Sequence, residues 1–537
     1  MIPQMKYTIP FLLSESVKKN SGRPALTFVG ETPYTYHDIA GHICNSIAFL
    51  QKQGISKGDK VALWGTNSPQ WGIAYLAITS MGAVVVPILP ETLPSDVVNI
   101  LDHSESKLIF LTEALSAKLA EEKTPDNCVQ INLEDHFDEA TEAQTTYDFD
   151  IFDVKEDDLA AIIYTSGTTG RAKGVMLTQR NISHVGWHSN DIQPINNQDR
   201  FLSVLPLAHT YENSIGFLLA MFFGACVHYL RKAPTASVLM PALQEVKPTL
   251  MLTVPLIIEK VYRQKIIRTF TKTRFMRFVY GIPVFRKVLH LIAGKKLYKS
   301  FGGHLKFFGI GGAKLNAVVE KFLYEAKFPY AIGYGLTESA PLLAGANPHY
   351  VRLESTGPAY TGITIKINNP NSDTGEGEIW AKGPNVMQGY YKEPELTAEV
   401  LTPDGWLKTG DLGKLDKDGY LYILGRSKNV IIGASGKNIY PEEIEALINN
   451  FPLVADSLVI ERKGRLVALV QLNMEELEKQ FAEMKINFET RKEEILEDIR
   501  KYVNGRVSQL SQLQSVVIQP TPFEKTATLK IKRYLYA

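Results

Sequence analysis

The segment from Tyr164 to Val175 has the composition of a phosphate-binding loop. It reads Tyr-Thr-Ser-Gly-Thr-Thr-Gly-Arg-Ala-Lys-Gly-Val, and its possible donors are Thr165, Ser166, Gly167, Thr168, Thr169, Gly170 and Lys173. Hydroxyl and backbone N–H donors on such a segment suit polyphosphate oxygens, and Lys173 adds a compact positive charge. The Walker spacing is absent, because Lys173 lies six residues after Gly167 and is followed by Gly174. Composition alone leaves an ordinary glycine- and serine-rich turn equally open.

The elements that must position this segment follow an α/β pattern. Apolar runs predict buried strands at 61–64, 84–88, 107–111 and 159–163, the last directly before the loop. Helical spacing predicts helices at 39–50 and 69–81. Strands that alternate with helices in this way indicate largely parallel sheets.

The pattern changes in the last third of the chain. Turn-rich residues at 368–378 predict hairpins, and hence a smaller β-rich portion at about 355–425. Helical patterns at 441–449 and 489–503 predict a compact α+β unit at the end of the chain. We therefore expect an N-terminal domain at 1–425 and a C-terminal domain at 426–537.

Composition restricts the function classes. The chain has 537 residues, with 58 Lys plus Arg against 57 Asp plus Glu, so no global charge attracts nucleic acid or membrane. Three isolated cysteines indicate a reducing compartment. No signal-peptide layout is present, and the apolar run 215–230 is too short for a bilayer span, so it predicts a buried helix that runs into a strand. We expect a soluble, cytoplasmic protein, monomeric or homodimeric.

The segment 164–175 resembles the phosphate loop of the adenylate-forming superfamily, which includes acyl-CoA synthetases, firefly luciferase and peptide-synthetase adenylation domains. That family usually has Pro before the lysine, where this chain has Ala172. Proline there would stiffen the loop without touching phosphate, so the departure changes little. The resemblance covers nearly the whole chain. It implies a large N-terminal domain of stacked α/β sheets with a β-rich portion, and a small mobile α+β C-terminal domain.

Further motifs follow in the order that the superfamily has, and they imply an ATP site. Gly309–Ala313 resembles the loop that approaches adenine, with Gly311, Gly312 and Ala313 as its closest residues. Tyr334–Glu338 resembles the next signature: Tyr334 would pack on adenine with Gly335 beside it, Thr337 would bond the α-phosphate, and Glu338 would hold Mg²⁺. In the later Thr409-Gly-Asp411 motif, Asp411 would accept both ribose hydroxyls.

Motifs of the C-terminal part imply a change of arrangement between two half-reactions. Gly425–Asn429 resembles the hinge, where Arg426 would reach the ribose and Lys428 would carry the torsion that swings the small domain. Gly436 lies in the loop that would admit the pantetheine arm of CoA. The last motif of the superfamily is matched by Thr526–Arg533, where Leu529 replaces the usual glycine. Three lysines near it, Lys525, Lys530 and Lys532, are therefore candidates for the catalytic role. We choose Lys530, because Ile531 and Arg533 keep its register.

The resemblance implies ATP-dependent activation of a carboxylic acid to acyl-AMP and then acyl-CoA, with release of AMP and pyrophosphate. Leu205–Glu212 resembles the segment that lines the acyl site, and it contains His209 as a catalytic candidate. The sequences at 387–394 and 401–408 resemble those of the long-chain fatty acid branch and favour it. Alternatives are an acyl-AMP ligase that loads a carrier protein, a medium-chain or aromatic acid CoA ligase, or a catalytically silent nucleotide- or lipid-binding regulator. Intact Lys173, Glu338, Asp411 and Lys530 speak against the last.

A basic segment at 260–300 stands outside these motifs. It contains twelve Lys or Arg residues and no Asp or Glu, interleaved with aromatic and aliphatic residues. Such a segment could contact an anionic bilayer, and a solvated basic helix pair explains it equally well. Nucleic acid is not expected as a partner, since core packing explains the aromatics.

Overall fold

The computed structural model divides into two compact units. Residues are described for 5–138, 148–166, 172–432, 438–451, 453–462, 464–473, 488–525 and 531–536. The first unit is Met1–Ile365, Ala381–Lys408 and Lys417–Leu421, and the second is Lys366–Trp380, Thr409–Asp416 and Tyr422–Ala537.

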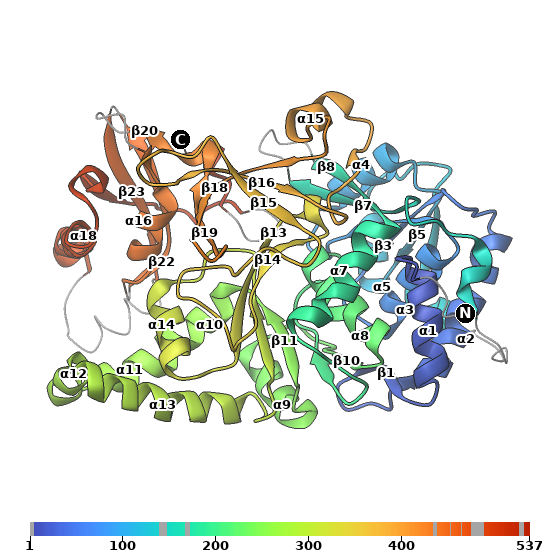
Figure 1. Cartoon of the computed structure of the whole chain (residues 1–537), viewed down its shortest axis with the longest axis horizontal. Coiled ribbons are helices and arrows are strands. Elements are labelled where there is room, and N and C mark those ends of the chain that lie inside the picture. Colours follow the sequence, from blue (N-terminus) through green and yellow to red (C-terminus); the bar gives the residue numbers. More distant parts are fainter. Residues whose placement is uncertain are drawn as a thin grey trace. The chain divides into compact units, whose positions relative to one another are not determined.

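An eight-stranded sheet forms one half of the first unit (Figure 1). Its order is β14 (Leu342–Gly345), β13 (Tyr330–Gly335), β12 (Phe307–Ile310), β11 (Leu250–Thr253), β9 (Arg200–Leu202), β10 (Cys226–Tyr229), β1 (Pro24–Phe28) and β2 (Tyr34–Thr35). The strands from β13 to β1 run parallel to their neighbours, and only the edge strands β14 and β2 are antiparallel.

A seven-stranded sheet forms the other half. Its order is β17 (Gly389–Tyr390), β8 (Ala172–Thr178), β7 (Leu159–Ser166), β4 (Val84–Ile88), β3 (Lys60–Trp64), β5 (Leu108–Leu111) and β6 (Val129–Asn132). The strands from β7 to β6 are parallel, whereas β7, β8 and β17 form an antiparallel edge. The α/β class with largely parallel sheets is therefore confirmed.

The helices form layers on both faces of the two sheets. Between the sheets lie α1 (Ile9–Asn20), α2 (Tyr36–Lys52), α3 (Pro69–Ser80), α7 (Gln179–Ile192), the π-helix η2 (Glu212–Leu218) and α8 (Leu219–Phe223). The outer face of the eight-stranded sheet carries α9 (Ala236–Val246), α10 (Pro255–Val261), the π-helix η3 (Tyr262–Ile267), α11 (Arg268–Thr271), α12 (Arg274–Gly281), α13 (Pro283–Ser300) and α14 (Ala317–Glu325). The outer face of the seven-stranded sheet carries α4 (Pro94–Ser104) and α5 (Glu113–Leu119). Shorter elements are α6 (Leu133–Asp138), η1 (Phe149–Phe152), η4 (Thr337–Ser339) and α15 (Pro394–Val400).

Alternation along single strands explains these layers, because successive side chains of a strand point to opposite faces. On β3, Val61 and Leu63 join the core between the sheets, while Ala62 and Trp64 join the core under α4 and α5. Both faces are buried, so the strand is apolar throughout, as expected for a parallel sheet covered on both sides.

The local predictions for the first unit are confirmed with small shifts of their ends. The expected helices at 39–50 and 69–81 are α2 and α3, and the expected strands are β3, β4, β5 and β7. Helix α2 begins at a capping box, since the Thr35 side chain accepts from Asp38 N and Asp38 accepts from Thr35 N. The apolar run 215–230 does fold as a buried helix that runs into a strand, but its first part is the π-helix η2.

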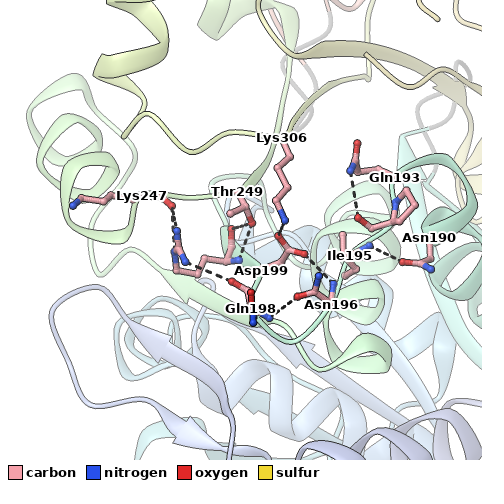
Figure 2. Close-up of polar contacts among 11 residues, drawn as sticks. Asn190, Gln193, Ile195, Asn196, Gln198, Asp199, Lys247, Thr249 and Lys306 are labelled. Carbon is pink, nitrogen blue, oxygen red and sulfur yellow. Dashed lines mark hydrogen bonds and ion pairs between the residues drawn. The ribbon is translucent and has the colours of Figure 1, made fainter. Parts of the chain in front are cut away.

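A polar network fixes the N-terminal end of β9, the strand that leads to His209 (Figure 2). The buried Asp199 carboxylate accepts from Lys306 Nζ at 2.8 Å and from Asn196 N at 2.9 Å. Arg200 N donates to Thr249 Oγ1 at 2.9 Å, which ties β9 to the start of β11. The strand is therefore held at its polar end before its apolar residues enter the core.

The second unit contains the expected β-rich and α+β portions. Its strands are β15 (Thr364–Asn368), β16 (Gly377–Lys382), β18 (Leu407–Leu415), β19 (Leu421–Arg426), β20 (Ile431–Ile432), β21 (Asn438–Ile439), β22 (Val454–Arg462), β23 (Arg465–Leu472) and β24 (Ser515–Ile518). Its α-helices are α16 (Pro441–Ile448) and α18 (Phe488–Asn504), and its short 3-10 helices are η5 (Ser427–Asn429), η6 (Gln509–Ser511) and η7 (Arg533–Leu535). Parts of β15, β16 and β18, and the first residue of β19, belong to the first unit. Helices α16 and α18 share one core with β22 and β23. The domain boundary at residue 426 stays a prediction.

Candidate active site

The expected phosphate loop begins and ends as strand. Strands β7 and β8 pair so that Thr165 lies opposite Lys173 and Ser166 opposite Ala172. Lys173 is thus a strand residue rather than a loop residue, and its backbone position is set by the sheet. Gly167, Thr168, Thr169 and Gly170 lie outside the described residues.

Tyr390 connects Lys173 with Glu338. Strand β17 pairs with β8, which places Tyr390 opposite Val175. The Lys173 ammonium lies 5.0 Å from the centroid of the Tyr390 ring, a cation–π contact. The Tyr390 hydroxyl donates a hydrogen bond of 2.9 Å to Glu338 Oε1, and Met387 N donates one of 2.9 Å to the Glu338 carbonyl. The phosphate-loop strand and the candidate metal ligand therefore share one buried aromatic residue.

The turn that carries Thr337 and Glu338 is held by residues far away in the sequence. Asn385 Nδ2 donates to the carbonyls of Ser339 at 2.8 Å and Leu342 at 2.7 Å, and Ser214 Oγ donates to the Ala340 carbonyl at 2.9 Å. A Cβ on Gly335 would lie 1.7 Å from the Pro341 carbonyl oxygen, so only glycine fits there. Tyr334 and Gly335 end β13 directly before this turn.

The candidate adenine loop follows β12. Gly311 N donates to the Thr253 carbonyl at 3.1 Å, and Gly312 has a φ of +84°, a left-handed conformation that favours glycine. Gly312 and Ala313 are exposed, whereas Gly311 is buried. The loop therefore presents backbone at the surface, where a planar ring could approach it.

An apolar cavity in the first unit ends at this loop. The cavity is narrow, with room of about 40 Å³ for water-sized molecules, and its apolar lining includes Ile192, Phe201, Ile215, Leu219, Leu250 and Leu252. Tyr211 and Gly309 also line it. A Cβ on Gly309 would lie 2.9 Å from the Tyr211 hydroxyl, and one on Gly311 would lie 3.1 Å from the Tyr211 ring. Tyr211 thus stands between the cavity and the candidate adenine loop.

His209 precedes this tyrosine and has a defined tautomer. Its Nδ1 accepts a hydrogen bond of 3.2 Å from Tyr211 N, so the proton of the neutral ring lies on Nε2. Asn67 fixes the approach to His209: its Nδ2 donates to the Leu205 carbonyl at 2.6 Å, and its Oδ1 accepts from Leu207 N at 2.8 Å. The Nε2 donor suits an oxyanion or a carboxylate.

Glu212 lies in the core and does not line the cavity. The Glu212 side chain packs against Gly216: a Cβ added to that glycine would lie 2.7 Å from the Glu212 carboxyl carbon. Glu212 Oε2 has no hydrogen-bond partner among the described residues. Burial raises the pKa of Glu212 to about 8. The carboxyl is therefore largely protonated at neutral pH. The expected acyl-site segment contributes Tyr211 to the cavity wall, while its Glu212 is a core residue.

In the second unit, the candidate ribose ligands are paired with each other. Arg426 Nε lies 2.8 Å from Asp411 Oδ1, and Asp411 N donates to Thr409 Oγ1 at 3.1 Å. The Thr-Gly-Asp motif is not a turn but lies within β18, with Gly410 at a φ of +70°. Asp411 is buried and Arg426 is exposed, so the pair offers a fixed carboxylate beside an accessible cation.

The C-terminal lysines are distinguished by their partners. Lys525 Nζ forms an ion pair of 2.8 Å with Asp456, and Lys532 Nζ lies 3.7 Å from Glu524. Lys530 lies outside the described residues, as does Gly436. Lys428 lies in η5 and is exposed.

The residues present would suit one ligand position of a magnesium ion. Among the described residues there is no group of three or more His, Cys, Asp or Glu side chains that could enclose a metal. Glu338 supplies one half-buried carboxylate, oriented by Tyr390. Mg²⁺ keeps several waters and takes one or two carboxylates plus phosphates, so a single oriented carboxylate is sufficient.

A comparison with known proteins identifies the family of this chain. The sequence profile of the AMP-binding enzyme family matches residues 13–391. The chain is 28% identical to long-chain-fatty-acid–CoA ligase FadD15 of Mycobacterium bovis over 94% of this chain and 90% of the relative. It is 29% identical to 4-coumarate–CoA ligase 2 of Nicotiana tabacum over 84% of this chain and 81% of the relative.

Solved structures share the fold. ATP-bound MatB from Rhodopseudomonas palustris matches with a TM-score of 0.77 and 23% identity over 99% of this chain and 98% of that one. The o-succinylbenzoate CoA synthetase MenE from Bacillus subtilis, in complex with AMP, matches with a TM-score of 0.77 and 22% identity over 98% of each chain. The described helices of the present chain include none that is long and apolar enough to cross a bilayer.

Proposed function

This chain belongs to the AMP-binding enzyme family, and on that premise we propose that it is an AMP-forming acyl-CoA synthetase for long-chain fatty acids. The single observation that carries the substrate proposal is the position of Tyr211. This residue lines a narrow apolar cavity and lies against the candidate adenine loop at Gly309 and Gly311. An acyl chain in the cavity would therefore present its carboxylate beside the nucleotide.

In the first half-reaction, a carboxylate oxygen attacks the α-phosphorus of ATP and pyrophosphate leaves. Positioning and electrostatics dominate such a transfer, because negative charge develops on the transferred group. The β- and γ-phosphates would lie on the Thr165–Lys173 segment, and Thr337 and Lys530 would contact the α-phosphate. Glu338 would hold Mg²⁺, which neutralises charge on the phosphate oxygens when bound.

Residues of the candidate adenine and ribose motifs would hold the nucleoside. Tyr334 and Gly311–Ala313 would contact adenine, while Asp411 would accept the ribose hydroxyls with Arg426 beside it. The ion pair between Arg426 and Asp411 supports this assignment, since it orients the carboxylate.

In the second half-reaction, the CoA thiolate attacks the acyl carbonyl and AMP leaves. Gly436 would leave room for the pantetheine arm, and Lys428 would carry the backbone rotation that exchanges the two arrangements. The Nε2 proton of His209 would contact the carbonyl oxygen as it gains charge.

A chain-length series tests the substrate. Each buried CH₂ contributes about 0.8 kcal/mol, so thioester formation should rise steeply with length and peak at about 12 to 18 carbons. Ile215→Trp, which fills the cavity wall, should move the optimum to shorter acids, whereas Val318→Trp on the exposed face of α14 should leave it unchanged.

An aromatic acid is the second candidate, because 4-coumarate–CoA ligase 2 is a relative at 29% identity. A cinnamate-like optimum would replace the long-chain proposal. Supply of CoA and of acyl carrier protein in parallel separates a CoA ligase from an acyl-AMP ligase. Acylation of the carrier alone would reject the CoA assignment.

A further inference from the structure

The helices from α10 to α13 form a projecting basic and apolar surface on the first unit. In Figure 1, α11 and α12 lie at one end of the long helix α13, at the lower left. The stretch 260–300 contains twelve Lys or Arg residues and no Asp or Glu. Ten of these cations are exposed, whereas Arg263 and Arg286 are half-buried and lie beside Glu259 and Glu325.

The same surface exposes large apolar side chains at its tip. Phe275 and Phe278 on α12 are 72% and 69% exposed, and Val284 and Phe285 at the start of α13 are 69% and 52% exposed. Arg274 and Arg277 stand directly before the two phenylalanines and are exposed too. We call the exposed residues of 268–299 the tip surface.

Helix α13 has two apolar faces, and only one of them is covered. His290, Ala293, Gly294 and Leu297 are buried, and a Cβ on Gly294 would lie 2.7 Å from Ala326, so this face packs on the end of α14. The other face carries Val284, Val288 and Ile292 at four-residue spacing, with 48% to 69% exposure.

Lysines continue this second face. Lys295 and Lys299 follow Ile292 at helical spacing and are exposed. The face is therefore apolar near the tip and cationic further along the helix. Such an arrangement immerses apolar side chains while cations remain at the depth of lipid headgroups.

We infer that the tip surface docks on anionic lipid bilayers, with Phe275, Phe278 and Phe285 inserted and the surrounding cations at the phosphates. Charge complementarity selects this occupant. A second copy of the same surface would be repelled, because it carries the same excess of positive charge. Nucleic acid would meet the cations but would leave the aliphatic stripe Val284–Ile292 in water. The inference does not depend on the proposed reaction.

Vesicle sedimentation with the full chain tests the docking. The parent should bind vesicles of phosphatidylcholine with 30% phosphatidylglycerol and not pure phosphatidylcholine, and 0.5 M salt should release it, because salt screens exposed charges. Each Lys or Arg near an anionic surface strengthens binding roughly fivefold. Reversal of Arg268, Arg274, Arg277 and Lys287 to Glu should therefore weaken binding at least a hundredfold.

A matched control separates a local surface from general charge. Reversal of four exposed lysines on other elements, Lys19, Lys52, Lys118 and Lys123, makes the same change in net charge. This control should bind vesicles within about fivefold of the parent, the contribution of one cation. Equal loss of binding in both variants would reject the tip surface.

Insertion has its own readout. Phe275→Trp should show a blue-shifted emission with vesicles and quenching by lipids brominated on their acyl chains. Ser at both Phe275 and Phe278 should weaken binding about tenfold or more per residue, with little change in its salt dependence. Binding without quenching, or binding of a model RNA more tightly than of vesicles, would overturn the inference.

Discussion

The Tyr390 hydroxyl donates a hydrogen bond of 2.9 Å to Glu338 Oε1, across 52 residues of sequence. The same ring lies under the Lys173 ammonium. Tyr390 thus orients the carboxylate expected to hold magnesium and also contacts the cation expected to hold phosphate. Tyr390 therefore has a positioning role, although it lies outside both the phosphate-loop segment 164–175 and the motif Tyr334–Glu338.

Tyr390→Phe tests this role. The ring over Lys173 would remain, while the hydrogen bond to Glu338 would be lost. A hydrogen bond to a charged group contributes about 1.5–3 kcal/mol, so adenylation should fall about tenfold or more. The concentration of Mg²⁺ at half-maximal rate should rise as well. Tyr391→Phe is the control, because its hydroxyl bonds Glu105 at the surface. An unchanged Mg²⁺ requirement in Tyr390→Phe would refute the positioning role.

Gly335→Ala should damage the site by steric clash. The new methyl group would lie 1.7 Å from the Pro341 carbonyl oxygen, so the backbone before Thr337 must move. A shift of about 1 Å in a positioning group can cost a hundredfold in rate, and we expect a loss of that size in pyrophosphate exchange. Gly22→Ala, where nothing lies within 4 Å of the added Cβ, should retain the parent rate. Similar rates for both variants would contradict the geometry.

The sequence predicted the parts of the site that are local in the chain. Apolar runs and helical spacing predicted the strands and helices of the first unit, because burial on both faces leaves a continuous apolar signal. The motifs contain glycine at 335 and 312, and the structure shows why. At Gly335 the Pro341 carbonyl leaves no room for a Cβ, and at Gly312 the backbone has a positive φ.

The residues that position the motifs could not be predicted in this way. Asn385 holds the turn at Ser339 from 46 residues away, and Asn67 holds the approach to His209 from 138 residues away. An asparagine in a loop carries no local signal of its partner. The core position of Glu212 was not foreseen either, since its neighbour Tyr211 faces the cavity and the π-helix that follows has no known spacing signal.

Variants at Lys530, Lys525 and Gly436 should separate the two half-reactions. Lys530→Ala should slow adenylation about a hundred- to a thousandfold, the cost of removing a positioned donor, while thioester formation from supplied acyl-adenylate continues. Lys525→Ala should slow neither half-reaction, because Lys525 pairs with Asp456. Gly436→Leu should instead block the thioester step. The assays are pyrophosphate exchange and thioester formation from synthetic adenylate. An adenylation defect in Lys525→Ala alone would show that Lys530 is wrongly assigned.

Glu212→Gln should change the pH dependence of stability. Burial raises the pKa of Glu212 from 4.5 to about 8, so between these values the folded protein keeps a proton that the unfolded chain releases. The free energy of unfolding therefore falls as pH rises through this range, by at most about 1.4 kcal/mol per pH unit. The amide cannot ionise, so the variant should gain Tm over the parent at pH 8.5 and match it at pH 5.

Thermal melts at both pH values check the Glu212 prediction. Glu31→Gln is the control, because its exposed carboxylate pairs with Arg231 and has a lowered pKa. Burial also raises the pKa values of Glu320 and Glu445 to about 7, but these act equally in parent and variant. Parallel pH profiles for parent and Glu212→Gln would contradict the buried, protonated carboxyl.

The transfer of a carboxylate oxygen to AMP is the measurement that tests the proposed reaction most directly. A long-chain fatty acid labelled with ¹⁸O in its carboxylate is incubated with ATP, Mg²⁺, CoA and the full-length protein. The mass of the nucleotide product is then measured by mass spectrometry. Attack on the α-phosphorus followed by cleavage of the acyl C–O bond leaves one labelled oxygen in AMP. The AMP should carry one ¹⁸O, and the pyrophosphate should be unlabelled. Unlabelled ADP together with labelled inorganic phosphate would show an acyl-phosphate route and would contradict the proposed reaction.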